Sequence, residues 1–171
     1  MNFIDEMDAI SRNVKHWILL ELNSNGFLGD VEQVITSNKN DEPVDTPCVW
    51  IVEHPTIPYK GQEADISTQQ RVSTTFEFVC IDYDEDLEEA QKKATNLATR
   101  VGASILKNRI YPEDEDDPTR LVHKILFQAL YPVGEVTIEG KSEKIPASSL
   151  VLEFVHVIDW MKCCRQRNNN G

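Results

Sequence analysis

The sequence predicts an α+β protein in which a mostly antiparallel sheet packs against two amphipathic helices, with a projecting loop and a hairpin arm. Two neighbouring segments support this fold class. Residues 71–83 alternate apolar and polar side chains, which is typical of a half-buried strand. In residues 87–106, after an acidic turn, apolar side chains recur every three or four residues, as on one face of a helix.

The strand and the helix are predicted to pack on each other through complementary faces. One face of the strand would carry Val72, Thr74, Phe76, Phe78 and Cys80. The helix would present an apolar stripe of Leu87, Ala90, Ala94, Leu97, Ala98, Val101 and Ile105. Its small alanines would allow a close approach to the aromatic face of the sheet. Asp86 and Glu89 have the spacing of a capping box, so the acidic turn has a structural role at the helix start.

The segments before residue 71 predict a helix, two strands and a long loop. Residues 29–35 predict a short strand, and residues 48–52 predict a buried strand because they are apolar and β-branched. Residues 54–70 contain two prolines and predict an exposed loop between paired strands. A first amphipathic helix is predicted over residues 3–22, with an apolar stripe of Ile4, Met7, Ile10, Val14, Trp17, Ile18 and Leu22.

The segments after residue 107 predict strands and a hairpin. Residues 121–131 predict a strand, with a helix as the alternative. Residues 136–145 predict a hairpin arm around a glycine-containing turn. Residues 150–160 predict the last strand and place His156 on its apolar face. We interpret this histidine as a hydrogen-bonded core residue, with a ligand or general base as the alternative.

Length and composition predict a globular protein of one domain. The 171 residues are interpreted as a domain over residues 1–161 and a polar tail over residues 162–171. With 40% hydrophobic and 27% charged residues, no run approaches the roughly 20 apolar residues of a membrane span. The acidic amino terminus is unlike a secretory signal, and the four cysteines lack the dense spacing of a disulfide-rich domain. We therefore expect no membrane association and a reducing cytoplasm.

The net charge of -12 comes from two acidic segments. Residues 82–89 hold six acids and residues 113–117 hold five, with no base in either segment. The other 18 acids nearly balance the 17 bases. No basic cluster that could neutralise phosphates occurs in the predicted fold, so the sequence disfavours a nucleic-acid groove.

The residue patterns predict no catalytic, cofactor-binding or metal-binding residues. The cysteines and histidines lack the spacing of a zinc site, and no nucleophile elbow or glycine-rich phosphate loop occurs. The acidic run of residues 113–117 lacks the glycine and the ligand spacing of an EF-hand, which favours a solvated loop over a calcium site. An enzyme would need another arrangement, such as a deep pocket that joins His156, Cys80 and an acid.

Two segments are candidates for contact with other proteins. The loop over residues 54–70 and the arm over residues 132–146 would project from the same core. Both are mainly polar segments that contain a few apolar residues. Ordinary loop packing is the alternative. The predicted subunit or partner interface consists of Ile57, Tyr59, Lys60, Val136, Ile138 and Ile145.

The order of these elements resembles that of the tail-terminator and tail-completion proteins of tailed bacteriophages and related archaeal viruses. The resemblance covers about residues 3–161 and rests on residues 49–52, 71–83, 87–106 and 150–160. It implies a small α+β subunit of a ring, a hexamer in the family, at the end of the tail tube. Such a ring contacts tube and sheath on one side and neck proteins on the other, and no catalytic residue carries over.

We therefore expect a structural virion protein, assembled in the host cytoplasm, whose ring terminates the tail tube and joins it to the neck or head. DNA would only pass through the ring. An acidic channel wall would repel it, and the candidates are Glu113, Asp114, Glu115, Asp116 and Asp117. The alternative is a cytoplasmic protein-binding adaptor that forms no ring, and the oligomeric state distinguishes the two.

Overall fold

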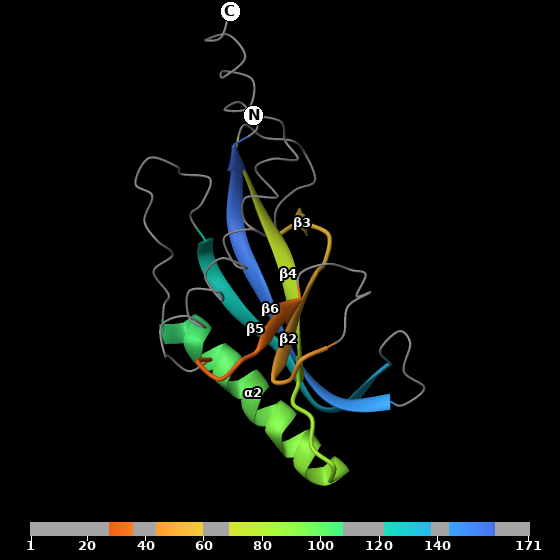
Figure 1. Cartoon of the computed structure of the whole chain (residues 1–171). Coiled ribbons are helices and arrows are strands. Elements are labelled where there is room, and N and C mark those ends of the chain that lie inside the picture. Colours follow the sequence, from red (N-terminus) through yellow and green to blue (C-terminus); the bar gives the residue numbers. More distant parts are fainter. Residues whose placement is uncertain (1–27, 36–43, 60–68, 108–121, 138–143, 160–171) are drawn as a thin grey trace, which may run out of the picture.

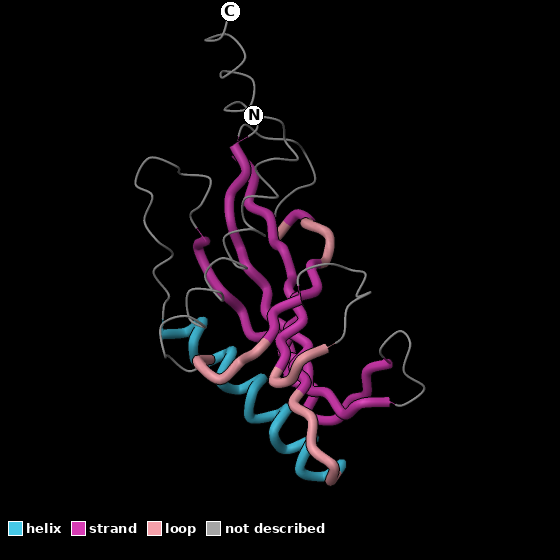
Figure 2. The backbone as a smooth tube through the Cα atoms, in the orientation of Figure 1, coloured by secondary structure: helices cyan, strands magenta, loops and turns pink. Residues whose placement is uncertain are grey.

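The computed structural model describes residues 28–35, 44–59, 69–107, 122–137 and 144–159. In these ranges the chain forms one six-stranded sheet, and the helix α2 runs diagonally across one of its faces (Figures 1 and 2). The elements are β1 Gln33–Ile35, β2 Cys48–Glu53, β3 Ile57–Pro58, β4 Gln69–Ile81, α2 Leu87–Lys107, β5 Val122–Thr137 and β6 Lys144–Asp159. The predicted helix over residues 3–22, the acidic run of residues 113–117 and the tail over residues 162–171 lie outside the described residues.

The strand order is β1-β2-β4-β6-β5, with β3 beside the first part of β4. Every pair is antiparallel except β1 with β2, which is parallel. The predicted α+β class with a mostly antiparallel sheet is confirmed. The sequence pattern of residues 29–35 gave no sign of the parallel pair, because strand direction depends on how the chain returns to the sheet.

The central strand β4 has the two faces predicted from its alternation. Its helix-side face is buried and consists of Val72, Thr74, Phe76, Phe78 and Cys80. Phe76 packs edge-on against Phe154 of β6, with ring centroids 5.3 Å apart and planes at 86°. This aromatic pair lies in the largest buried cluster, which also contains the α2 residues Leu97 and Val101.

Helix α2 buries the predicted stripe with one exception. Ala90, Ala94, Leu97, Ala98, Val101 and Ile105 are all buried. The prediction was wrong for Leu87, whose side chain is 66% exposed. Leu87 is the first residue of α2, and Figure 1 shows this end of the helix extending past the sheet. Among the described residues, no helix is long and apolar enough to cross a membrane.

Asp86 caps the start of α2. Its Oδ1 accepts hydrogen bonds from the backbone N–H groups of Glu88 at 2.9 Å and Glu89 at 3.5 Å. The backbone N–H of Asp86 donates to Asp84 Oδ1 at 3.0 Å, while the Glu89 carboxylate binds Lys92. The predicted capping residue is therefore correct, but Asp84 takes the place that a capping box would give to Glu89.

Replacing Asp86 with alanine is expected to lower the free energy of unfolding by about 1 kcal/mol, because two N–H groups at the helix start lose their acceptor. Urea unfolding followed by circular dichroism measures the change. Glu85→Ala is the matched control, since Glu85 is exposed in the same turn and accepts no capping hydrogen bond. Equal destabilisation by the two substitutions would contradict the assigned cap.

The segment predicted as an exposed loop contains a short edge strand. β3 pairs with β4 through Ile57 opposite Ser73 and Pro58 opposite Val72. The N–H of His54 donates to the carbonyl oxygen of Thr75 at 2.9 Å, and the N–H of Tyr59 donates to that of Arg71 at 3.0 Å. The described part of this segment therefore follows β4, because its backbone finds hydrogen-bond partners there.

Strands β5 and β6 are longer than the predicted segments 121–131 and 150–160. They form one hairpin, and its far end, where Val136 pairs with Ile145, is the predicted arm. The strand prediction for residues 121–131 is confirmed over its helical alternative. Figure 1 shows the β5–β6 hairpin bending away from the rest of the sheet at this end. The side chain of His156 lies outside the described part of the chain.

Candidate interaction surfaces

Strand β5 exposes a strip of large apolar side chains, which we call the β5 strip: Phe127, Leu130, Tyr131 and Val133. Phe127 is 67% exposed and Val133 is 78% exposed. β5 is the last strand in the sheet order, and its outer edge has no strand partner among the described residues. Several exposed large apolar side chains on one edge strand are typical of a protein-binding site.

The position of β5 explains why the strip is exposed. Phe127 lies opposite Leu152 and Leu130 lies opposite Leu150, so these side chains share the face of the sheet that carries the core. Leu150 and Leu152 are buried because α2 packs mainly on β4 and β6. The outer strand extends beyond this cover. Tyr131 lies opposite Ser149 on the other face, so the strip is exposed on both sides of the sheet.

The edge of β5 is poorly suited to adding another strand. Its pairing with β6 is interrupted by three register shifts, and Pro132 has no backbone N–H to donate. The carbonyl oxygen of Pro132 accepts hydrogen bonds from Gln91, from Thr95 Oγ1 at 3.2 Å and from Ser148 Oγ at 3.1 Å. These bonds fix the bend of the hairpin to α2. The strip is therefore a surface for side-chain contacts rather than for sheet extension.

The arm residues of the predicted interface pack within the chain. Ile145 is 9% exposed and contacts a second buried cluster that contains Ile35, Cys48, Ile81 and Ala147. Val136 is half-buried against the same cluster. Ile138 lies outside the described residues. Ile145 therefore has little surface to offer a partner, because the alternation of β6 turns it toward this cluster.

The loop residues of the predicted interface lie at one end of the sheet. Ile57 is 56% exposed, and Tyr59 follows it along the edge of β4. The Lys124 ammonium lies 5.6 Å from the centre of the Tyr59 ring, a cation–π distance, and Arg71 is exposed beside Tyr59. Lys60 lies outside the described residues. We call the group of Ile57, Tyr59, Arg71 and Lys124 the basic end.

The start of α2 forms a second charged surface around two exposed apolar side chains. Tyr83 is 55% exposed and Leu87 is next to the exposed acids Glu85 and Glu88. Lys92 binds Glu88 at 3.2 Å and Glu89 at 2.9 Å. The Lys93 ammonium binds Asp84 at 2.6 Å and so holds the pKa of that carboxyl below its ordinary value. Glu85 has no ion-pair partner among the described residues. We call Tyr83, Glu85, Leu87 and Glu88 the acidic end.

The described cysteines are buried thiols without a catalytic setting. Burial raises the pKa of Cys48 to about 12 and raises that of Cys80 further. A thiolate is therefore scarce near neutral pH at both positions. No three metal-ligating side chains gather among the described residues. His156 pairs with Val72, eight residues along β4 from Cys80, which separates the two backbones by about 26 Å. His156 and Cys80 are therefore too far apart along the sheet to line one small pocket together.

No family model matches the chain, and no curated protein matches it either. The resemblance to tail-terminator proteins stays a prediction. The three surfaces described above are the features from which a function can be argued.

The sequence patterns missed the β5 strip as an interaction surface. The apolar run that begins at Leu126 and ends at Val133 predicted a strand but did not indicate which of its side chains are exposed. Its proline is the available signal, because proline within a strand favours an edge position. These side chains are exposed because α2 packs mainly on β4 and β6 and leaves β5 largely uncovered.

Proposed function

We propose that the chain is a structural virion protein whose ring terminates the tail tube and joins it to the neck or head. The observation that supports this function best is the β5 strip, four large apolar side chains on an outer strand whose backbone is bent and fixed by α2. A ring subunit of this kind needs exposed surfaces for contact with other proteins. The described surfaces fit that requirement.

The strip is assigned to the contact with the tail tube. A ring subunit needs lateral contacts with its neighbours and an axial contact with the tube on which it sits. Lateral contacts between identical copies need two complementary patches. The four side chains of the β5 strip carry no charge, and we assign them to the contact with a different protein. Sheath and neck proteins would meet other faces of the ring.

The proposal includes the first predicted amphipathic helix, over residues 3–22. Leu28, which follows this segment, is fully buried in the core cluster, and Asp30 pairs with Arg100 of α2. The chain therefore enters the helix side of the sheet directly after the segment. In that position the apolar stripe of residues 3–22 would share the cover of the sheet with α2. The acidic run of residues 113–117 is proposed to line the channel through which DNA passes.

The double substitution Phe127→Ser and Val133→Ser is expected to weaken binding to purified tail tubes at least tenfold, because the two most exposed apolar side chains of the strip are lost. Co-sedimentation with the tubes measures binding, and native mass spectrometry counts the subunits, six being expected. The paired control is Glu32→Ser with Glu53→Ser, two exposed positions toward the other edge of the sheet, one just before β1 and one at the end of β2.

A wild-type protein that stays monomeric at high concentration, both alone and with tail tubes, would overturn the proposed function. Such a monomer that still binds one other protein would favour the adaptor. Ring formation with undiminished tube binding by the double variant would reject the β5 strip as the tube contact.

A further inference from the structure

The two ends of the sheet carry opposite charge around apolar side chains that are exposed or, for Tyr59, half-buried. At the basic end, Ile57 and Tyr59 lie beside Arg71 and Lys124. Ile57 is opposite Ser73 and Lys124 is opposite Val155, which places both on the face of the sheet away from α2. Neither Arg71 nor Lys124 forms an ion pair with a described residue. Both side chains are exposed.

The acidic end has the complementary composition. Tyr83 and Leu87 are exposed, with Glu85 and Glu88 beside them. Lys92 pairs with Glu88 and Lys93 pairs with Asp84, whereas Glu85 is exposed and has no ion-pair partner among the described residues. An apolar centre with charged residues around it is the usual make-up of a specific protein contact.

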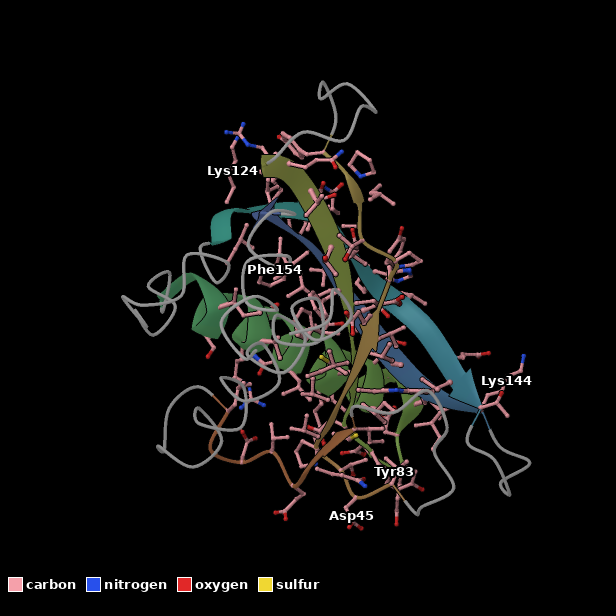
Figure 3. The ribbon with its side chains drawn as sticks, turned by 90° about the horizontal axis from the view of Figure 1, so that it is seen from above. Asp45, Tyr83, Lys124, Lys144 and Phe154 are labelled. Carbon is pink, nitrogen blue, oxygen red and sulfur yellow. The ribbon has the colours of Figure 1, made fainter. Side chains whose placement is uncertain are left out.

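The ends are far apart, so one molecule cannot bring them together. Arg71 lies near the start of β4 and Ile81 ends it, ten residues later, which corresponds to about 33 Å of strand. Tyr83 follows two residues after that strand. Figure 3 shows Lys124 and Tyr83 at opposite ends of the molecule, and Figure 1 places the start of β4 and the start of α2 at opposite ends as well.

We infer that the basic end of one copy docks on the acidic end of the next copy, so that Arg71 and Lys124 face Glu85 and Glu88 across an apolar contact of Ile57 and Tyr59 with Tyr83 and Leu87. This inference rests on the proposed ring and specifies its lateral contact. Charge complementarity favours a second copy as the occupant of both ends. Because the two patches differ, the contact is heterologous, and repeating it closes a ring when the rotation permits.

Charge reversal tests the inference in the full-length chain. The first variant carries Arg71→Glu and Lys124→Glu, and the second carries Glu85→Lys and Glu88→Lys. Each variant alone would bring like charges together, and its ring dissociation constant is expected to rise at least tenfold. An equimolar mixture restores opposite charges at every contact, so rings of alternating subunits are expected. Native mass spectrometry separates these species because the two variants differ in mass.

A matched control carries Glu32→Lys and Glu53→Lys, which changes the net charge as much as the second variant at exposed positions outside both ends. It is expected to form rings like the wild type, and circular dichroism checks that every variant is folded. Rings formed by each variant alone, or no rings from the mixture, would overturn the inferred contact while wild-type rings preserve the proposed function. A monomeric wild type would overturn both.

Discussion

Replacing Phe76 with alanine is expected to lower the free energy of unfolding by about 3–5 kcal/mol. Phe76 is fully buried at the centre of β4 and packs edge-on against Phe154, with ring centroids 5.3 Å apart. Truncation would remove the transfer free energy of the ring and its contact with Phe154. It would also leave a cavity that two long strands and α2 cannot readily close, because their backbones are held by hydrogen bonds.

Urea unfolding of Phe76→Ala and Phe127→Ala measures this effect with a control of identical chemistry. Phe127 is 67% exposed, so its truncation is expected to change the free energy of unfolding by less than about 0.5 kcal/mol. Unfolding should be measured at a protein concentration at which the chain is monomeric, since association stabilises the folded state. Similar losses for the two substitutions would contradict the assigned core.

Replacing Ala94 with leucine is expected to lower the free energy of unfolding by about 1–3 kcal/mol, although leucine has the higher hydrophobicity. Ala94 is fully buried on the α2 face that meets the sheet. The larger side chain would have to displace the helix or enter strained rotamers. The expected loss follows from the close approach that the small residues Ala90, Ala94 and Ala98 permit.

Thr99→Leu is the control for this substitution, because Thr99 lies on the same helix and is exposed. Leucine favours a helix more than threonine does, so this change is expected to be neutral or slightly stabilising. Thermal unfolding of the two variants at equal concentration compares them. A stabilised Ala94→Leu protein would mean that a void separates α2 from the sheet.

Local patterns in the sequence were sufficient to predict β4 and α2. The alternation from Val72 to Cys80 and the stripe from Ala90 to Ile105 were confirmed residue by residue, because each pattern reflects which side of one element faces the core. Asp86 was identified as the cap for the same reason, since capping involves groups within one turn. Leu87 was wrongly assigned to the buried stripe. Its exposure depends on where the strands of the sheet end, and the helix sequence does not contain that information.

The surfaces followed a different rule. Ile145 has the sequence character of an exposed arm residue, yet the second cluster buries it; Phe127 has that of a core residue, yet it is exposed. Both outcomes depend on neighbours that are distant in sequence. Likewise, Tyr59 meets Lys124 only because β3, β4, β6 and β5 lie side by side at that end of the sheet.

The sequence by itself determined the fold class, the central strand with its covering helix, the helix cap and the lack of local catalytic motifs, because periodicity and capping are local. Only the tertiary structure decided the strand order, the parallel β1–β2 pair, the exposed β5 strip and the oppositely charged ends. Exposure depends on which elements cover a side chain, and charge complementarity depends on where distant residues meet. Neither the exposure of a side chain nor the complementarity of two charged surfaces can be predicted from a local sequence pattern.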